Sequence, residues 1–295
     1  MPARVPLVSI VTPALNMGRF LEETIRSVLD QDYPRIEYLV MDGGSTDTTL
    51  EVLERYRDRL RFVSAPDGGQ AAAINRGFDL TSGEIFAFLN ADDTYLPGAV
   101  SAAIEGFLRR PQAGVIYGNA WHVSEGGSRI AAYPVEPFDA ARLARRCFIC
   151  QPAAFLRRDV FTAAGKLDPT LRFALDYDLW IRVARRSSMQ KIDAFLAASR
   201  MHAASKTMGQ MRLAMEETIR VLKRHYGYVP YNWLYGYEHH RLTGQLLALQ
   251  PPGFSASSAL SSLLRGARHN WRHPVRYARD ILATGREGMA WLNRS

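Results

Sequence analysis

Cysteine is scarce in this 295-residue sequence, and long hydrophobic runs are absent from it. The two cysteines, Cys147 and Cys150, are too few for a disulfide framework, and no second pair or nearby histidine completes a zinc site with them. We therefore predict that both are ordinary buried thiols. No apolar run approaches the roughly 20 residues that a membrane-spanning helix needs, so the sequence predicts no such helix.

Two common phosphate-binding loops are also missing. The sequence contains neither a Walker lysine motif nor Gly-x-Gly-x-x-Gly, which argues against a nucleoside triphosphatase and a dinucleotide dehydrogenase. The first 15 residues faintly resemble a signal peptide, because Arg4 precedes apolar residues. Pro6 and Pro13 interrupt this run, however, and no small-residue cleavage pattern follows. We interpret the segment as the first strand of a cytoplasmic protein.

Excess positive charge is confined to the last third of the chain. The net charge is +8, yet residues 1–199 hold 23 basic and 24 acidic side chains, whereas residues 200–295 hold 14 and 5. A nucleic-acid-binding protein would interleave basic residues with stacking aromatics in a recognisable module, and the sequence has none. We therefore expect no nucleic acid partner. The basic region indicates either a surface drawn to anionic lipid or a solvated helical face.

Strand-like and helix-like stretches alternate over the first 118 residues, which favours a parallel sheet connected by crossover helices. The pattern then loosens, and beyond residue 208 it is helical. With 47% hydrophobic residues, the chain can bury one large domain with an appendage. Predicted strands cover residues 7–12, 36–41, 60–64, 84–89, 114–117, 153–157 and 189–193.

Polar clusters follow three of these strands and begin at Pro13, Asp42 and Asn90. In an open α/β sheet, ligands bind beyond the carboxyl ends of the strands. Asp42 can accept hydrogen bonds from a base or a ribose, and Gly43 lets the backbone come close to a ligand. The same Gly-Gly-Ser-Thr-Asp stretch is also typical of a tight turn with a helix cap, so both interpretations stay open.

The third cluster ends an apolar strand in one Asn and two Asp. The run over residues 86–89 leads directly into Asn90, Asp92 and Asp93. Carboxylates beside a dry strand are costly unless a cation or a donor pairs with them. The oxygens of Asn90 and Asp92 can reach one hard cation that also holds phosphate oxygens. Asn and Asp also initiate turns after strands, and these residues alone do not separate the two interpretations.

A fourth polar cluster opens a predicted helix at Asp176. One Asp at a helix start is usually a cap, but Asp176 and Asp178 together exceed what capping needs. Sugar transfer with inversion at the anomeric carbon requires a carboxylate that takes the proton of the acceptor hydroxyl. That carboxylate is separate from the metal that holds the leaving diphosphate. The sequence offers both parts.

The four clusters follow one another as in the family-2 glycosyltransferases. The resemblance covers roughly residues 7–206 and implies the GT-A fold, an α/β fold with a Rossmann-like, mixed but mainly parallel sheet flanked by helices. It also implies a nucleotide-diphosphate sugar donor, a divalent metal (Mg²⁺ or Mn²⁺) and inversion of configuration. It rests on Ser-Ile-Val-Thr-Pro (9–13), Val-Met-Asp-Gly-Gly-Ser-Thr-Asp (40–47), Leu-Asn-Ala-Asp-Asp (89–93) and Asp-Tyr-Asp-Leu-Trp (176–180), with further likeness in 67–77 and 151–168.

The resemblance assigns roles residue by residue. Asp42 would bind the nucleotide base, Asp92 would bind metal and diphosphate, and Asp176 would be the general base. His202 lies in a segment that resembles the one closing over the diphosphate, so it would contact metal or phosphate; a structural histidine is the alternative. The other donor-binding residues would be Pro13, Asn16, Gly43, Asp67, Gln70, Asn75, Asn90 and Ala91, and the metal ligands would be Asp92, Asn90 and His202.

The sequence departs from the family pattern at two positions. The metal motif of the family is usually Asp-x-Asp, and Asn90 replaces the first acid, which removes a charge while keeping an oxygen ligand. We expect weaker metal binding or a contribution from Asp93. The acidic pair around the base is often Glu-Asp, and here Leu175 precedes Asp176. The base is retained without a neighbouring acid to tune it.

We predict a catalytic domain over residues 1–206, with a nucleotide-binding half (1–118) and an acceptor half (119–206), followed by a helical region over 207–295. In that region arginines recur every three or four residues between apolar residues, as in a helix lying on anionic lipid at the inner face of the plasma membrane. Helices packed on the catalytic domain are the alternative, and Pro274 should split the pattern in two. The residues are Arg265, Arg268, Arg272, Arg276 and Arg279, alternating with Leu260, Leu264, Trp271, Val275, Ala278 and Leu282.

Three functions compete at this point. The favoured one is an inverting glycosyltransferase that builds a cell-surface polysaccharide or glycolipid on a saccharide or lipid-linked acceptor. A nucleotidyltransferase on a similar sheet is less well supported, because its Gly-rich, Arg-containing loop is absent after the first strand. A nucleotide-sugar binding module without catalysis is the third, because Asn90 replaces an acid.

Overall fold

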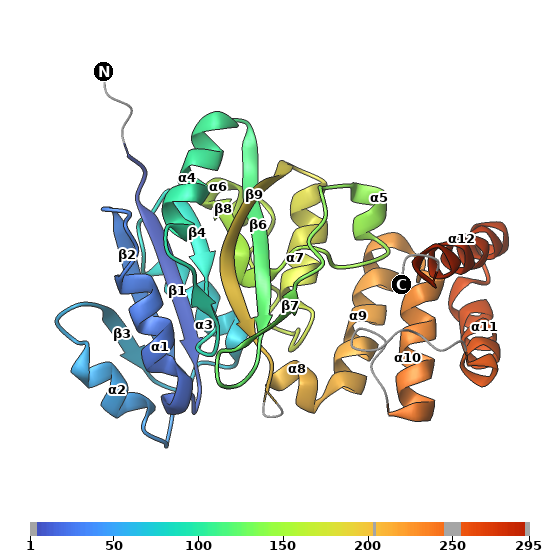
Figure 1. The fold of residues 1–295 in the computed structure, drawn as a ribbon, viewed down its shortest axis with the longest axis horizontal. Coiled ribbons are helices and arrows are strands. Elements are labelled where there is room, and N and C mark those ends of the chain that lie inside the picture. The colour runs from blue at the N-terminus through green and yellow to red at the C-terminus, as the bar shows by residue number, and fades with distance from the viewer. Residues whose placement is uncertain (1–4, 203–204, 245–254, 293–295) are drawn as a thin grey trace. The chain divides into compact units, whose positions relative to one another are not determined.

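The computed structural model describes residues 5–202, 205–244 and 255–292. It forms two compact units. The first contains the described residues of 1–139 and 147–205, and the second contains residues 140–146 with the described residues of 206–295. Figure 1 shows the sheet in the first unit and the helices of the second. The two units are described separately below.

A nine-stranded sheet forms the first unit, with the order β3-β2-β1-β4-β8-β6-β9-β5 and with β7 paired to β6. β1, β2, β3 and β4 pair in parallel, as do β6 and β9, whereas β8, β5 and β7 pair antiparallel to their neighbours. The predicted mixed, mainly parallel sheet is therefore confirmed. The strands are β1 (Val8–Ala14), β2 (Ile36–Asp42), β3 (Arg61–Ser64), β4 (Ile85–Phe88), β5 (Thr94–Tyr95), β6 (Ala113–Val123), β7 (Arg129–Ala132), β8 (Ala154–Arg157) and β9 (Ser188–Arg200).

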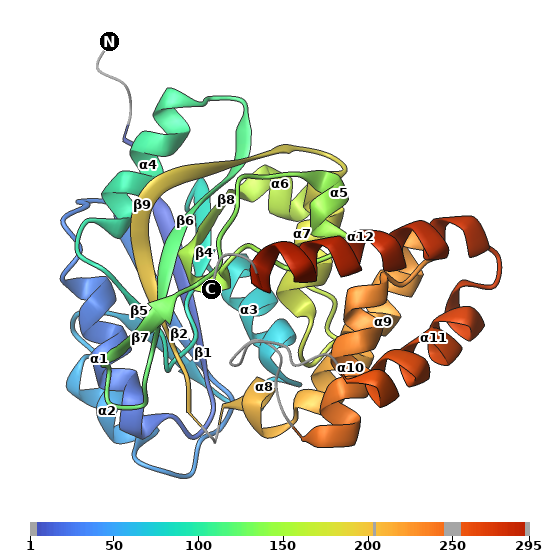
Figure 2. The ribbon, with the colours of Figure 1, turned by 45° about the vertical axis from the view of Figure 1, so that its right-hand side comes forward.

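Helices cover both faces of this sheet (Figures 1 and 2). One face, with Ile10 and Val40, packs against α1 and α4 in one apolar cluster. On the other face, a Cβ at Gly77 of α3 would lie 2.6 Å from Val11, so a glycine is needed where α3 crosses β1. The helices of this unit are α1 (Gly18–Leu29), α2 (Thr49–Arg55), α3 (Gln70–Asp79), α4 (Ala99–Arg109), α6 (Arg158–Ala163) and α7 (Leu175–Ala184), with a 3₁₀ turn at Gln151–Ala153.

Two strands extend well beyond their predicted ends. β6 and β9 were expected over 114–117 and 189–193, and they run over Ala113–Val123 and Ser188–Arg200. The two strands pair in parallel along this length, with shifts in register between Ala113 and Ala120. Such shifts interrupt the alternation of apolar and polar residues, so the sequence pattern ends before the strand does.

The second unit is helical. Its core is built largely from tyrosines, among them Tyr228, Tyr231 and Tyr277, around Leu234. The predicted break at Pro274 is confirmed, because one helix ends at Asn270 and the next begins at Pro274. The predicted break at residues 250–253 lies outside the described residues. The helices are α5 (Ala140–Leu143), α8 (Lys206–Gly209), α9 (Met211–Tyr226), α10 (Tyr231–Thr243), α11 (Ala256–Asn270) and α12 (Pro274–Leu292).

None of the helices in the described part of the chain combines the length and the apolar content that a membrane crossing requires.

Candidate active site

Three of the predicted polar clusters lie at one edge of the sheet. Because β1 pairs in parallel with both β2 and β4, the carboxyl ends of these strands share an edge. Ala14 at the end of β1 is paired with Asp42 at the end of β2, and the turn from Asn90 to Asp93 follows β4. The loops after the three strands therefore lie where an open α/β sheet binds its ligands.

Asp42 anchors the loop after β2. Its buried carboxylate accepts hydrogen bonds from the backbone N–H groups of Gly44 (3.2 Å) and Ser45 (3.1 Å). The hydroxyls of Ser45 and Ser64 also donate to it, the latter at 2.6 Å. These four donors occupy both carboxylate oxygens, so the side chain holds the loop in shape. Its predicted contact with a nucleotide base stays a prediction.

Asn16 joins the loop after β1 to the loop after β2. Its backbone adopts a φ of +54°, a conformation that Asn tolerates better than most residues. Its N–H donates to the Ser45 hydroxyl at 2.7 Å, and its side-chain oxygen accepts from the N–H of Thr46 at 2.9 Å. Pro13 is buried within β1. The two loops are therefore fixed relative to each other before any ligand binds.

Gly43 allows the Asp67 carboxylate to come close to the backbone. A Cβ at Gly43 would lie 3.0 Å from Oδ2 of Asp67. The other oxygen, Oδ1, accepts from the N–H of Gly69 at 2.7 Å, directly before α3. Asp67 is only partly buried, so at this edge it is more accessible to a ligand than Asp42 is.

Asn90 is held by hydrogen bonds on both sides of its amide. Its oxygen accepts from Nε2 of Gln70 at 2.7 Å, and its nitrogen donates to Asp93 at 3.2 Å and to Gln151 at 3.4 Å. An Asp at this position could not donate to Asp93, and it would add a like charge in a dry site. The departure from Asp-x-Asp thus has a structural reason. Gln151 was not identified from the sequence.

Asp93 is a buried acid that favours its protonated form. Burial, and then the neighbouring charge of Asp92, raise the pKa of its carboxyl to about 8. Its Oδ1 accepts from the N–H of Arg200 at 2.9 Å, and its carbonyl accepts from the hydroxyl of Thr24 at 2.8 Å. Asp93 therefore links the turn after β4 to the end of β9 and to α1.

The side chains of Asp92 and His202 are in contact although 110 residues separate them in the sequence. Nε2 of His202 lies 3.0 Å from Oδ2 of Asp92, and the His202 ring packs against Phe20 at 4.7 Å between centroids. Arg200 donates from Nε to the Asp92 carbonyl at 2.9 Å and forms an ion pair with Glu23. The histidine side chain is 2% exposed and the Asp92 side chain 16%, so the pair presents a carboxylate to the outside. The buried Ala91 precedes Asp92.

This pair fits two positions around a divalent cation. Nε2 of His202 and Oδ2 of Asp92 share a hydrogen bond at 3.0 Å, and both atoms are of types that bind divalent cations, so a cation would take the place of the shared proton. Among the described residues, no group of three or more His, Cys, Asp or Glu side chains gathers to hold a metal, so phosphate oxygens and water would complete the shell. The Asn90 oxygen accepts one hydrogen bond, from Gln70, and its second lone pair is left for a cation.

The side chain of Asn75 forms hydrogen bonds with the backbone of a loop that is distant in sequence. Its amide nitrogen donates to the carbonyl of Leu167 at 2.8 Å, and its oxygen accepts from the Leu167 N–H at 3.0 Å. This reciprocal pair fastens α3 to the chain before α7. The predicted contact of Asn75 with a nucleotide therefore stays a prediction, and its observed role is structural.

The two carboxylates of α7 lie in different surroundings. Burial raises the pKa of the Asp176 carboxyl to about 6, and its Oδ1 accepts from the N–H of Tyr177 at 2.8 Å. Asp178 is fully buried and forms an ion pair with Arg182, with Oδ2 at 2.8 Å from Nε and 2.7 Å from Nη2. Asp178 therefore stabilises the helix, whereas no cationic side chain of the described residues pairs with the Asp176 carboxylate.

Cys150 lies close to both halves of the predicted site. Burial raises the pKa of its thiol well above the usual value, and the charges of Asp93 and Asp176 raise it further. Burial also raises the pKa of Cys147 and of Tyr133, and the charge of Asp176 adds to both shifts. The two cysteines are free thiols, with Cys150 buried and Cys147 partly exposed. The structure thus brings the turn after β4 and the start of α7 to one buried thiol, which no spacing in the sequence indicated.

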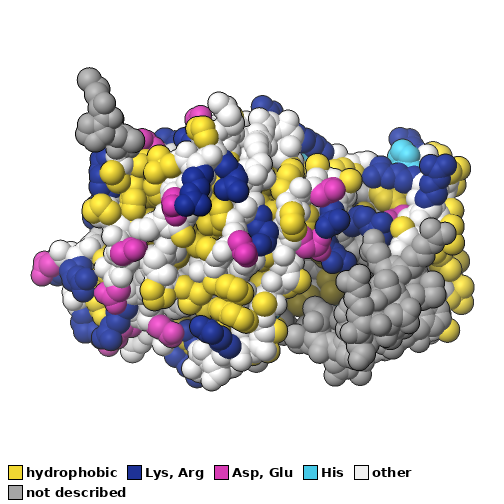
Figure 3. Space-filling view, turned by 45° about the horizontal axis from the view of Figure 1, so that its top comes forward, with side chains coloured by type: hydrophobic (Ala, Val, Ile, Leu, Met, Phe, Trp, Pro, Cys, Tyr) yellow, Lys and Arg dark blue, Asp and Glu magenta, His cyan; other side chains and the backbone are white. Residues whose placement is uncertain are grey.

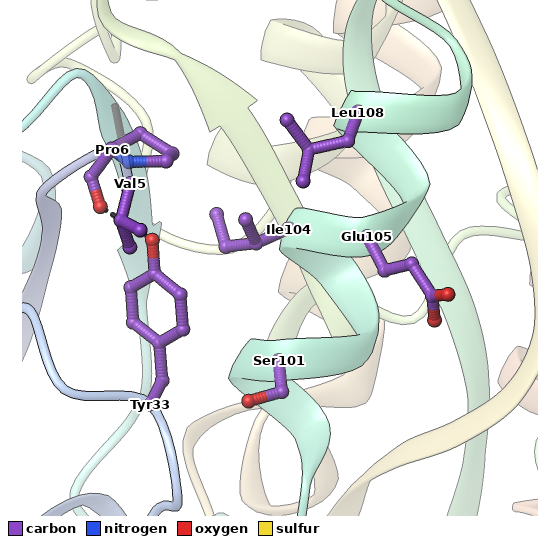
Figure 4. A pocket seen from close by; sticks show the side chains of 7 residues that line it. All are labelled: Val5, Pro6, Tyr33, Ser101, Ile104, Glu105 and Leu108. Atoms are coloured by element: carbon purple, nitrogen blue, oxygen red, sulfur yellow. Dashed lines mark hydrogen bonds between the residues drawn. The ribbon is translucent and has the colours of Figure 1, made fainter. Parts of the chain in front are cut away.

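A hollow of about 200 Å³ lies at the other edge of the sheet (Figure 4). Val5 and Pro6, which precede β1, face Ile104 and Leu108 of α4 across it, and Tyr33 lies on the same side as Val5 and Pro6. It is mostly apolar and contains none of the predicted site residues.

Comparison with known proteins agrees with this geometry. A family model described as glycosyl transferase family 2 matches residues 9–163, which include Asp42 and Asp92 but not Asp176. An uncharacterised glycosyltransferase of Rickettsia prowazekii is 29% identical over 68% of this chain and 66% of its own length. The hyaluronan synthase of Pasteurella multocida is 30% identical over 61% of this chain and 19% of its own length. The chain thus spans about two thirds of the first relative and about a fifth of the second.

Solved structures share the fold at low sequence identity. Staphylococcus aureus TarS 1–349 in complex with UDP-GlcNAc is 17% identical, with a TM-score of 0.60 over 89% of this chain and 81% of that chain. The mannosyltransferase PcManGT from Pyrobaculum calidifontis, in complex with GDP-Man and Mn²⁺, is 17% identical, with a TM-score of 0.54 over 99% and 80%. Because the family model matches more than half of its residues, the chain belongs to glycosyl transferase family 2.

Proposed function

We propose that this chain transfers a sugar from a nucleotide-diphosphate sugar to an acceptor hydroxyl with inversion at the anomeric carbon. The observation that carries the proposal is that two acidic side chains of the site are paired with basic side chains, whereas a third is not. Asp92 is paired with His202, Asp178 is paired with Arg182, and Asp176 is left as a carboxylate with a pKa of about 6. A carboxylate whose pKa is raised by burial, and which has no such ion-pair partner, is typical of an acid–base site.

Asp176 is the proposed general base. With a pKa of about 6 it is ionised at neutral pH, and it is a stronger base than an ordinary Asp. As the acceptor oxygen bonds to the anomeric carbon, the hydroxyl proton passes to a carboxylate oxygen of Asp176. The bond between that carbon and the diphosphate oxygen breaks on the opposite face, and the nucleoside diphosphate leaves with its electrons.

Asp92 and His202 are the proposed ligands of Mg²⁺ or Mn²⁺, with Asn90 as a further ligand through the lone pair that Gln70 does not use. When bound, the cation would neutralise the charge that develops on the leaving diphosphate. The side chains themselves orient the diphosphate: His202 is fixed by Phe20, and Arg200 holds the carbonyl of Asp92. The mannosyltransferase neighbour that binds GDP-Man with Mn²⁺ supports this assignment.

The loops after β1 and β2 are the proposed nucleotide site. Asp42 and Asn16 hold these loops, and the more accessible Asp67 lies beside Gly43, where a base or ribose can approach the backbone. Gln70, at the start of α3, connects these loops to the turn after β4 through its hydrogen bond to Asn90. A donor lying along the edge would have its base near Asp67 and its diphosphate near Asp92.

The acceptor is proposed to be a saccharide or a lipid-linked sugar in the synthesis of a cell-surface polysaccharide or glycolipid. Support comes from the similarity to the hyaluronan synthase of Pasteurella multocida. We further propose that the chain works in the cytoplasm, where nucleotide sugars are made.

Release of the nucleoside diphosphate tests this function directly. The chain would be incubated with UDP-sugars and GDP-sugars in Mn²⁺, without acceptor, and the released nucleotide measured with a phosphatase-coupled assay. We expect slow release of a nucleoside diphosphate from at least one donor, with water as the acceptor, and loss of this release in Asp92→Asn.

Two other outcomes would replace the proposal. Release of pyrophosphate from a nucleoside triphosphate and a sugar phosphate would indicate a nucleotidyltransferase. Tight donor binding without any turnover, with water or with a panel of saccharide acceptors, would indicate a binding module.

A further inference from the structure

The outer face of α11 and α12 carries large apolar side chains that no described part of the chain covers. From α11 to Trp271, which directly follows this helix, these side chains recur at intervals of four and seven, and along α12 at an interval of seven, so they fall on one side of each helix. Five of them, which we call the outer stripe, are between 61% and 68% exposed: Leu260, Leu264, Trp271, Val275 and Leu282.

The opposite sides of the two helices are fixed by close packing. The hydroxyl of Tyr277 in α12 donates to the carbonyl of Ser262 in α11 at 2.9 Å. A Cβ at Gly266 would lie 1.7 Å from the Tyr277 oxygen, so only glycine fits there. Asn270 is buried and bonds the backbone of Val229 at 2.8 and 2.9 Å. Neither helix can turn the outer stripe inward without losing these contacts.

Four exposed arginines accompany the outer stripe: Arg268, Arg272, Arg276 and Arg279. The guanidinium of Arg272 lies 4.8 Å from the ring of Trp271, and that of Arg276 lies 4.2 Å from the ring of Tyr228 in the helical core. None of them has an acidic partner among the described residues. The one acidic residue between 255 and 284 is Asp280, which is turned inward and accepts from Tyr228 at 3.0 Å and from the backbone of Tyr231. Figure 3 shows hydrophobic and basic side chains next to one another in the region of α11 and α12, which Figure 1 labels.

Arg265 of α11 differs from these four arginines because it has partners within the helical unit. It is bonded to the buried Glu238, which also accepts from Arg241 at 2.8 Å. Its guanidinium also lies 4.5 Å over the ring of Tyr237. Arg265 is therefore part of the helical core, and it does not belong to the exposed set that the sequence pattern grouped with it.

We propose that the outer stripe and its four arginines rest on the surface of a membrane that contains anionic phospholipids. Leucine, valine and tryptophan side chains would enter the boundary between headgroups and acyl chains, and the arginines would bind lipid phosphates above them. A second copy of this chain fits less well, because pairing the same face would bring unneutralised arginines together.

Docking of this kind goes beyond sugar transfer and does not depend on it. If the proposed lipid-linked acceptor is correct, docking would also hold the enzyme in the layer where that acceptor is concentrated. The tests below use binding alone, so failure of the transfer mechanism and failure of the docking are distinguishable.

The charge of the face is tested by sedimentation with vesicles. The full chain would be mixed with phosphatidylcholine vesicles, with and without phosphatidylglycerol, and spun at low and high salt. We expect binding only to the anionic vesicles and weaker binding at high salt. Arg268→Gln/Arg279→Gln should bind about 30-fold more weakly, from about 1 kcal/mol for each arginine at the surface. The matched control, Arg59→Gln/Arg110→Gln, removes two exposed arginines from the first unit and should bind like the wild type.

The contribution of the apolar side chains to vesicle binding is tested with a second double variant and a matched control. Leu264→Ala/Trp271→Ala should lose most of the binding while its unfolding temperature stays unchanged, because both side chains are 68% exposed. The control Leu108→Ala/Ile130→Ala removes two exposed apolar side chains from the first unit and should bind normally. Equal binding by all variants, or none by the wild type, would overturn the proposal. Self-association that Leu264→Ala/Trp271→Ala abolishes, without vesicle binding, would assign the face to a second copy instead.

Discussion

Replacing Asp176 by Asn should make the protein more stable and nearly inactive. Burial raises the pKa of this carboxyl from 3.8 to about 6, which corresponds to roughly 3 kcal/mol against the charged form in the fold. Asn has almost the same volume, carries no charge, and its oxygen can still accept from the N–H of Tyr177. We therefore expect a gain in unfolding free energy that approaches about 3 kcal/mol at pH 8.

The size of this gain should depend on pH in a defined direction. An acid whose pKa is raised in the fold holds its proton more tightly when folded, so it lowers stability as the pH rises from about 4 to about 6. Asn resembles the protonated acid, and its advantage over Asp176 should vanish at low pH. At pH 5 the gain should be about half of that at pH 8. Urea unfolding of both proteins at the two pH values measures it.

Asp178→Asn is the matched control two residues away. It breaks the ion pair of the fully buried Asp178 with the largely buried Arg182, and we expect a loss of roughly 3 kcal/mol in unfolding free energy, the lower end for a buried pair. Transfer or donor hydrolysis should fall by at least ~10²-fold in Asp176→Asn, and in Asp178→Asn only as far as folded protein is lost. A destabilised but active Asp176→Asn would refute the assignment of the base.

The remaining predictions concern the donor site and the pH profile. A nucleoside diphosphate should raise the unfolding temperature far more with Mg²⁺ or Mn²⁺ than with EDTA, and Asp92→Asn should erase the difference; equal shifts with and without metal would exclude the Asp92–His202 cation site. Gly43→Ala puts a Cβ 3.0 Å from the Asp67 carboxylate, so we expect at least several-fold weaker nucleotide binding by calorimetry, and unchanged binding would remove Asp67 from the site. Below neutral pH, kcat/KM should fall as the Asp176 carboxylate, with its pKa of about 6, is protonated; a profile flat down to pH 5 would contradict its role as base.

The sequence predicted the carboxyl-end edge because local signals define it. The apolar runs of β1, β2 and β4 end in turn-forming polar residues, and a parallel arrangement places those ends together. The split at Pro274 was equally local, since proline lacks the N–H that a continuous helix needs. These features require only the pattern of neighbouring residues.

The contacts inside the site could not be predicted in this way, because they join distant segments. Arg200 and His202 reach Asp92 and Asp93 only because β9 runs far beyond its apolar pattern and pairs with β5. The position of Cys150 near both Asp93 and Asp176 is likewise a product of tertiary structure.

Asn90 shows the limit most clearly. Its residue type indicated a weakened metal ligand, whereas its hydrogen bonds to Gln70, Asp93 and Gln151 give it a structural role that residue type alone does not reveal.

The stereochemistry of donor hydrolysis tests the central claim most directly. With an α-linked nucleotide sugar and water as the acceptor, proton NMR distinguishes the first-formed anomer of the free sugar before it equilibrates. Attack opposite the leaving diphosphate, with Asp176 accepting the proton, predicts that the β-anomer forms first and that Asp176→Asn forms neither. The α-anomer as the first product, or unchanged hydrolysis in Asp176→Asn, would contradict the mechanism.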